Sequence, residues 1–274
     1  MTAALAAALL GRAGPTLSVP ESARGFLPWR AVVAAGAHRR LVADTDAGLV
    51  PQPAGTRPPL SINACPQSRP VLRTLVLDRD RLRHPTVTIA ALVAISEGLG
   101  GYLAERGEDI GELGAEIPMA LVKTNANNNF RNVGIGLYPL LNRDDRAARI
   151  SAELTDRRRR GQHPAMLASA AAFAAMPAPL LRWGVGKFDP AARASAVTGN
   201  TVVSSVNRGE ADLSFGGRQV VFTAGYPALS PMMSLTHGVH GIGETVALSV
   251  CADAANVDVD AYLDRLARAL DWQP

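Results

Sequence analysis

The chain has 274 residues, of which 47% are hydrophobic and 19% charged, and its net charge is +4. Such a composition, without a long low-complexity tract, is typical of a globular protein and excludes extended disorder. Aromatic residues make up only 5% and do not alternate with the basic residues, so a nucleic-acid-binding surface is not expected. Two cysteines, Cys65 and Cys251, are too few for a disulfide framework or a zinc motif and favour a reducing, cytoplasmic setting.

The first 70 residues are predicted to hold short helices and a linker. An apolar run of about ten residues precedes Arg12, which is shorter than the roughly 20 residues that span a bilayer. Residues 28–44 have a helical pattern, whereas residues 51–70 are too rich in proline for a helix or a central strand. We therefore expect N-terminal helices and a Pro-rich linker over 1–70, followed by an α/β domain over 71–274.

The middle of the chain mixes the periods of strands and helices. Residues 71–78 alternate like a strand, and residues 84–107 are predicted to form a long helix that starts near Pro85. Residues 115–122 have the apolar character of an interior strand, although Pro118 requires an edge or a bulge. A strand is predicted over 130–140, and helices over 144–160 and 163–183, the second interrupted by two prolines.

The last hundred residues are predicted to be mostly strand, over 200–208, 218–227 and 235–253. A final amphipathic helix over 259–272 has Asp258 or Asp260 available as its N-terminal cap. The irregular alternation of strand and helix predicts an α/β fold with a mixed sheet flanked by helices.

No P-loop, dinucleotide fingerprint, HExxH, GxSxG or CxxC motif occurs in the sequence. Ser204 and Ser205 lie in a strand pattern without the glycine elbow that exposes a nucleophile. His38 and Asp44 are six residues apart, which places them on different faces of a helix. The basic run Arg157–Arg160 is able to meet a phosphate or an acidic membrane surface, but the simpler interpretation is a solvated helix C-terminus.

His237 and His240, in the stretch LTHGVHGIGETV, are the strongest candidates for chemistry by residue type, since imidazole often acts as base or metal ligand. On a strand, however, side chains three residues apart point to opposite faces, so the two rings should not converge on one ligand. Gly241 and Gly243 are expected in a turn, and Gly238 at a bulge or a close backbone approach. No catalytic or metal-binding residue is therefore assigned.

From about residue 59 to 270, the sequence resembles the C-terminal half of the bacterial wax ester synthase/diacylglycerol acyltransferase family. The likeness rests on a collinear series of segments rather than on one motif. These segments are PPLSIN with Arg69, TVTIAALVAISEGLGGYLAERGE, EIPMALV, FRNVGIGLYPLLNRDDRAARI, NTVVSSVNRGE, YPALSPMM, LTHGVHGIGETVALSVCAD and VDAYLDRLARAL.

The resemblance implies a fold like chloramphenicol acetyltransferase, with two α/β halves and a tunnel between them. In the family an HHxxxDG motif in the first half supplies the general base that activates a hydroxyl for attack on a fatty acyl-CoA thioester. The present sequence has no HHxxxDG motif. The family's TVND segment has Thr88 and Ile89 in place of its Asn-Asp, and its GN strand persists only as Arg131 and Asn132.

Two hypotheses follow: the chain is the C-terminal portion of an acyl-CoA-dependent O-acyltransferase, inactive without its other half, or it is a noncatalytic lipid- or partner-binding relative. The expected partners are a separately encoded N-terminal half or a second copy, and a lipid or acyl-CoA. Acyl-CoA is expected as a substrate and no cofactor is expected. The implied setting is cytoplasmic, at most peripheral to a membrane or lipid body. The residues that the resemblance places along the tunnel are Thr88, Asn132, Ser204, Ser205, Pro231, Thr236, His237 and His240.

Overall fold

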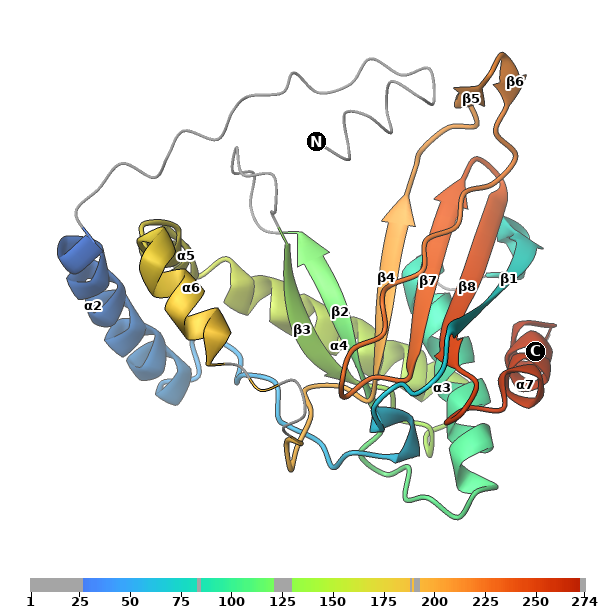
Figure 1. Ribbon diagram of the computed structural model, residues 1–274, viewed down its shortest axis with the longest axis horizontal. Coiled ribbons are helices and arrows are strands. Elements are labelled where there is room, and N and C mark those ends of the chain that lie inside the picture. Colours follow the sequence, from blue (N-terminus) through green and yellow to red (C-terminus); the bar gives the residue numbers. More distant parts are fainter. Residues whose placement is uncertain (1–26, 83–84, 121–129, 188, 190–192, 272–274) are drawn as a thin grey trace.

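The protein is described here by a computed structural model that covers residues 27–82, 85–120, 130–187, 189 and 193–271. A six-stranded mixed sheet, with the order β1-β8-β7-β4-β2-β3, forms its centre (Figure 1). The strands are β1 (Pro70–Asp78), β2 (Gly114–Ala120), β3 (Phe130–Gly136), β4 (Thr201–Asn207), β7 (Leu235–Ile242) and β8 (Thr245–Asp253). The predicted mixed α/β fold is thus confirmed.

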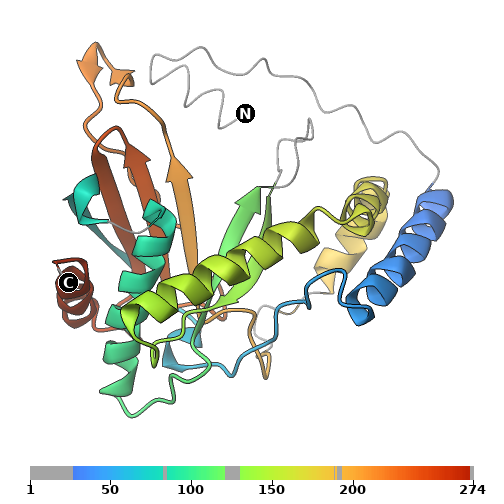
Figure 2. The same cartoon turned by 180° about the vertical axis from the view of Figure 1, so that it is seen from behind.

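Helices α3 (Val87–Ala104), α4 (Arg143–Gly161) and α7 (Val259–Asp271) lie on one side of this sheet (Figure 2). Helices α2 (Leu27–Asp46), α5 (Pro164–Ala174) and α6 (Ala178–Gly186) stand beside the β3 end of the sheet (Figure 1). Two short 3-10 turns, Ser61–Asn63 and Arg79–Arg81, flank β1. The helix predicted at the very N-terminus lies outside the described residues.

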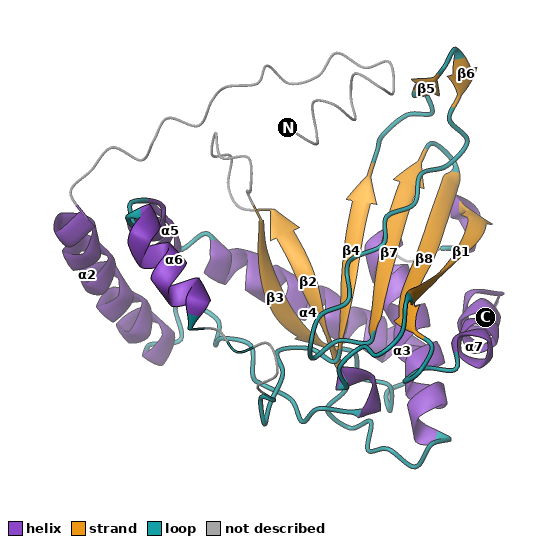
Figure 3. Ribbon diagram, in the orientation of Figure 1, coloured by secondary structure: helices purple, strands orange, loops and turns teal. Residues whose placement is uncertain are grey.

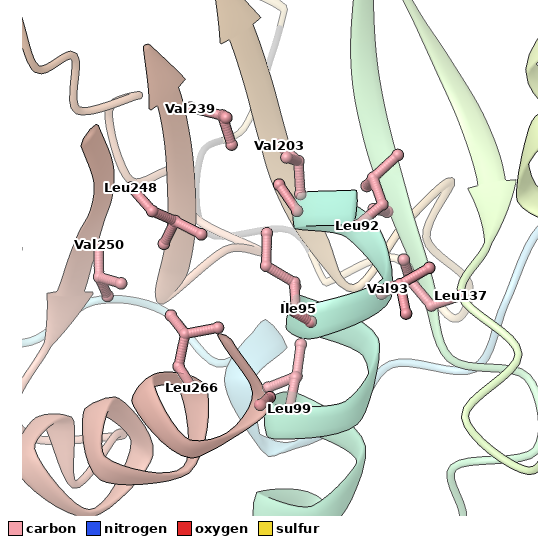
Figure 4. Close-up of a cluster of buried hydrophobic side chains, with 14 of the residues drawn as sticks. Leu92, Val93, Ile95, Leu99, Leu137, Val203, Val239, Leu248, Val250 and Leu266 are labelled. Atoms are coloured by element: carbon pink, nitrogen blue, oxygen red, sulfur yellow. The ribbon is translucent and has the colours of Figure 1, made fainter. Parts of the chain in front are cut away.

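The core lies between the sheet and α3 (Figure 4). Helix α3 is long and apolar enough to cross a membrane, but 72% of it is buried inside the protein, so it serves as the central core helix. Leu92, Ile95 and Leu99 are fully buried against sheet residues such as Leu248. At Gly98 an added Cβ would lie 3.1 Å from Cα of Leu266, because α7 crosses α3 at that point. The absence of a side chain there allows the close approach.

The helix ends agree with the capping signals in the sequence. The Asp258 carboxylate accepts a hydrogen bond from Ala261 N at 3.0 Å and caps α7. Thr86 caps α3, and Asn142 caps α4. His163, which precedes Pro164, caps α5 through its ring Nδ1, and its Nε2 lies 3.1 Å from the Asp44 carboxylate. A polar side chain at each of these positions satisfies an orphan backbone N–H.

The strand predicted over 218–227 is largely wrong. Only β5 (Ser214–Phe215) and β6 (Arg218–Gln219) pair there, as a small hairpin that projects beyond the main sheet (Figure 3). The chain that follows lies on the face of the sheet, because hydroxyl groups on that face hold its carbonyls. Thr236 Oγ1 donates to Pro227 O at 2.6 Å, and Ser249 Oγ donates to Gly225 O at 2.5 Å. An alternating pattern does not distinguish a segment held in this way from a strand in a ladder.

The basic run at the end of α4 is not simply solvated, which corrects the simpler of the two interpretations. Arg157 donates to Gln52 O and Gly134 O at 2.9 Å each, and Arg159 donates to Leu49 O at 2.8 Å. Arg160 donates to Pro51 O at 2.7 Å. Three of the four arginines therefore attach the segment after α2 to the domain, and within this run only the Arg158 side chain makes no hydrogen bond or ion pair with the described residues.

Candidate functional site

The sheet divides between β2 and β4, and we call this opening the fork. The two strands pair in parallel at only two positions, Ala115 with Thr201 and Glu116 with Val202. Beyond them β2 continues beside β3, and β4 continues beside β7, so the strands diverge in a V (Figure 1). Pro118 comes just after the last paired residue, where its missing N–H costs no bond to β4. The fork thus provides the edge that Pro118 was predicted to require.

A polar cluster holds the closed end of the fork. Asn200 is fully buried; its side-chain oxygen accepts from Gly114 N at 3.0 Å, and its amide donates to Pro58 O at 2.9 Å. The same amide donates to Oδ1 of Asn63 at 3.0 Å, and Asn63 in turn donates to Met232 O at 2.9 Å. Buried amides with satisfied donors and acceptors fix a backbone arrangement. The closed end is therefore rigidly tied to the linker and to the segment before β7.

A cavity of about 900 Å³ lies at the fork on the sheet face opposite α3, and we call it the front cavity. Strands β2 and β3 line one side, β4 lines another, and residues 225–233 cross beside it. Its polar lining includes Glu116, whose carboxylate accepts from the Asn132 amide at 3.2 Å. Its apolar lining includes Phe130, Val202 and Met233. A cavity of this size and mixed lining suits a small organic ligand.

His240 faces the front cavity. Its ring Nδ1 lies 3.4 Å from Oγ1 of Thr223, and a Cβ added at Gly225 would lie 2.4 Å from its Nε2. The imidazole is therefore enclosed between β7 and the crossing segment, with 6% of the residue exposed. Burial lowers the pKa of His240, and the nearby charge of Arg208 lowers it further, so the ring is neutral at pH 7.

His237 points to the opposite face, toward α7. Its Nε2 lies 2.5 Å from the Tyr262 hydroxyl, and its Nδ1 lies 3.0 Å from Oγ1 of Thr201. Complete burial lowers the pKa of His237 to about 3, so this ring stays neutral inside the core. The prediction that the two histidines do not converge is confirmed. In the part of the chain that the structure describes, no group of three or more His, Cys, Asp or Glu residues could hold a metal ion.

A second cavity of about 420 Å³ lies at the fork on the face that carries the helices, and we call it the back cavity. Helix α4, the start of α3 and strand β2 surround it. Thr88 Oγ1 and Ser205 Oγ lie 2.7 Å apart within its lining and connect α3 to β4. Arg131, Arg157 and Arg158 also line it. The residues Pro118, Ala120 and Ser205 border both cavities, so the two meet at the fork.

The eight tunnel candidates do not gather at one place. Asn132, Ser204 and His240 line the front cavity, Thr88 lines the back cavity, and Ser205 lines both. The other three line neither of these cavities. Thr236 is covered by Pro227, and His237 lies in the core. Pro231 presents its carbonyl to Arg193, which donates to it at 2.6 Å.

Several residues of the site were not predicted from the sequence. Asn200 is the first residue of the segment NTVVSSVNR and directly follows Gly199, where an added Cβ would lie 2.5 Å from the backbone of β2. A glycine immediately before a buried asparagine is a sign of close backbone approach that could have indicated the closed end of the fork. Arg131 and Arg158 come together at the back cavity only through the fold, because they lie on two different elements.

Residues 137–272 match the model of the WS/DGAT C-terminal domain. The matched residues include β4, β7, β8 and helices α4 to α7. These residues form a WS/DGAT C-terminal domain. The resemblance predicted from the sequence is thereby confirmed, and the domain is of the acyl-CoA acyltransferase type.

Solved structures place the WS/DGAT C-terminal domain and the strands before it in one fold. The wax ester synthase/diacylglycerol acyltransferase from Marinobacter aquaeolei VT8 is similar with a TM-score of 0.53 and 17% identity, over 94% of this chain and 58% of that one. The starter condensation domain of rhizomide synthetase RzmA, in complex with C8-CoA, is similar with a TM-score of 0.50 and 14% identity, over 96% and 58%. The predicted likeness to the chloramphenicol acetyltransferase type of fold is confirmed.

The chain therefore spans 58% of the length of each of these two structures. None of the curated proteins with which the sequence was compared matches it. At identities below 20% the structural likeness establishes the fold, while activity and substrates have to be argued from the site.

Proposed function

We propose that this chain is the C-terminal portion of an acyl-CoA-dependent O-acyltransferase of the wax ester or triacylglycerol synthesis type. The observation that carries the proposal is the front cavity at the fork of a WS/DGAT C-terminal domain. The cavity combines apolar side chains with a few polar groups and has room for an acyl chain or an acceptor alcohol. In this proposal the chain supplies a wall of the substrate tunnel.

The general base, in this proposal, comes from a half that carries HHxxxDG, a motif that this sequence lacks. His240 is poorly suited to that role, because its Nε2 lies against Gly225 and its Nδ1 faces Thr223. A general base has to reach the hydroxyl that it deprotonates within about 3 Å. His237 is sealed in the core. The chain alone is therefore expected to bind substrate without transferring the acyl group.

A partner is proposed because the chain exposes large apolar side chains. Trp183 on α6 is 64% exposed and Trp29 on α2 is 66% exposed, and Phe130 beside the front cavity is 54% exposed. Exposed aromatic groups of this size commonly mark an interface with another protein or a lipid surface. The partner of choice is the HHxxxDG half, and the proposed setting is cytoplasmic, peripheral to a membrane or lipid body where neutral lipids collect.

Reconstitution tests this function. The purified chain is incubated with palmitoyl-CoA and hexadecanol, or with a diacylglycerol, with and without a separately produced HHxxxDG half, and release of the CoA thiol is followed. No turnover is expected from the chain alone, and turnover is expected from the mixture. His240→Gln is the informative variant, and His38→Gln, on the exposed side of α2, is its control.

Turnover by the chain alone that disappears in His240→Gln but persists in His38→Gln would show that the base resides in this domain. Tight binding of acyl-CoA without turnover in any mixture would instead favour the noncatalytic binding relative.

A further inference from the structure

The back cavity has an unbalanced charge. Among the described residues that line it are three arginines and no aspartate or glutamate. Glu153, one turn before Arg157 on α4, forms an ion pair with Arg157. The side chains of Arg131 on β3 and Arg158 on α4 make no hydrogen bond or ion pair with any of the described residues. Two cationic groups thus remain available to a ligand in a cavity of about 420 Å³.

The protein retains Arg131 at an energetic cost. Burial lowers the pKa of Arg131, and the neighbouring charge of Arg160 lowers it further. The guanidinium lies beside the end of α4, since a Cβ added at Gly161 would be 3.0 Å from its Nη2. The helix C-terminus offers a weak negative field, but no carboxylate of the described residues pairs with the guanidinium. A half-buried cation without an anionic partner is unfavourable unless a bound anion offsets the cost of its desolvation.

The neutral part of the lining suits the rest of a phosphorylated ligand. Gln162 and the Thr88–Ser205 pair offer neutral hydrogen-bonding groups, and Ile117 and Leu154 offer an apolar wall. Guanidinium groups bind phosphate oxygens through paired N–H donors, which gives both strength and orientation. The shared lining at Ser205 and Pro118 joins this cavity to the front cavity.

We propose that Arg131 and Arg158 bind a phosphate ester in the back cavity, with the remainder of the same ligand directed through the fork toward the front cavity. A coenzyme A thioester has this chemistry, because it carries phosphates at one end and an acyl chain at the other. A phospholipid has a related chemistry. The choice of coenzyme A deepens the proposed function and rests on it, whereas the phosphate site itself does not.

Binding measurements on the whole chain test the site. Isothermal titration with coenzyme A, with inorganic phosphate and with vesicles of phosphatidylglycerol or phosphatidylcholine compares the wild type, Arg131→Gln, Arg158→Gln and the double variant. Arg268→Gln, near the end of α7, is the control because it changes the net charge equally away from the cavity. We expect coenzyme A to bind about tenfold more weakly to each single variant, and about a hundredfold more weakly to the double variant.

The comparison of these probes also identifies the source of the phosphate. Loss of coenzyme A binding in the double variant supports the site with a soluble ligand. Loss of phosphatidylglycerol binding alone, with phosphatidylcholine inert throughout, supports the site but assigns it to a lipid head group. Equal binding of every probe by the double variant and Arg268→Gln overturns the proposal.

The Tm of the Arg131→Gln variant distinguishes a ligand-binding role of Arg131 from a structural one. If Arg131 serves a ligand, Arg131→Gln should leave the Tm of the free protein unchanged or raise it, because a partly buried cation is removed. It should also abolish the rise in Tm that coenzyme A causes in the wild type. A lowered Tm with unchanged ligand-induced stabilisation contradicts the proposal.

The two proposals can fail separately. An acyl transfer reaction that proceeds in the reconstituted mixture, with identical coenzyme A affinity in wild type and double variant, removes the phosphate site and leaves the proposed function. Phosphate binding that depends on both arginines, with no acyl transfer in any mixture, removes the proposed function and leaves the phosphate site.

Discussion

The imidazole of His237 and the phenol ring of Tyr262 meet edge to face inside the core, with ring centroids 5.6 Å apart and the hydroxyl 2.5 Å from Nε2. Both residues are fully buried. The contact ties the middle of β7 to α7, and burial raises the pKa of Tyr262 while it lowers that of His237. The pair is a hydrogen-bonded packing element, and it makes folding sensitive to acid.

Acid should destabilise the protein through His237. Its pKa is about 3 in the folded state and about 6.5 in the unfolded state. Because only the unfolded chain takes up this proton between those values, the stabilisation is fully present above about pH 6.5 and is lost as the pH falls toward 3. The slope from this group is about 1.4 kcal/mol per pH unit. Urea unfolding from pH 7 to 4 measures it.

His237→Gln removes the titrating ring and should reduce the slope of the unfolding free energy against pH by the contribution of one proton. The stability of this variant at pH 7 will also fall. His38→Gln on the exposed side of α2 should leave the slope unchanged. Equal slopes in the wild type and His237→Gln would mean that His237 does not titrate differently on unfolding.

Neighbouring glycines on α3 should respond oppositely to alanine. A Cβ at Gly100 would lie 2.7 Å from Cβ of Pro139, whereas nothing lies within 4 Å of a Cβ at Gly101. Gly101→Ala should therefore stabilise the protein by about 0.5–1 kcal/mol through helix propensity. Gly100→Ala should destabilise it by about 1–3 kcal/mol, because the rigid proline ring has to move. Chemical denaturation of both variants is the measurement, and a Gly100→Ala protein as stable as Gly101→Ala would refute the contact.

A side chain at position 238 should displace the segment that crosses the sheet. A Cβ at Gly238 would lie 1.9 Å from the carbonyl oxygen of Gly225, a backbone atom that no rotamer change can move. Gly238→Ala should push residues 223–229 off β7 and open the front cavity. Hydrogen exchange should then accelerate in that segment and in the His240 region, while α4 keeps its protection. Unchanged exchange over 223–229 would contradict this close approach.

Loss of the Arg160 side chain should release the segment after α2. Arg160 donates to Pro51 O in that segment and to Thr45 Oγ1 in the last turn of α2, so Arg160→Gln removes one attachment of each. We expect faster hydrogen exchange over residues 45–52, with the core strands unaffected. Arg158→Gln, two positions earlier and without such contacts, is the matched control. Equal protection of residues 45–52 in the two variants would disprove the attachment.

The sequence predicted most of the elements because their patterns are local. Proline at the start of α5, Asp258 before α7 and the alternation over β1 follow from neighbouring residues alone. The opposite orientation of His237 and His240 likewise follows from strand geometry. The segment 220–229 could not be predicted, because its position depends on hydroxyl groups of Thr236 and Ser249 on other strands.

The site was harder to predict than the fold for the same reason. Thr88 and Ser205 are 117 positions apart in the sequence, yet their hydroxyls meet at the fork. In the basic run on α4, Arg157, Arg159 and Arg160 hold the segment after α2, whereas Arg158 lines the back cavity without such a bond. Charge patterning identifies such a run but does not tell which of its members has a partner.

The two-residue pairing of β2 with β4 has a mechanical consequence. Only Ala115 and Glu116 connect the β2–β3 arm to the rest of the sheet by a ladder, while Asn200 anchors the closed end. The angle between the two arms is therefore held by few backbone hydrogen bonds, and we expect a ligand bound at the fork to change that angle. The same strand pair that leaves an edge for Pro118 should thus allow the shape of the sheet to change when a ligand binds.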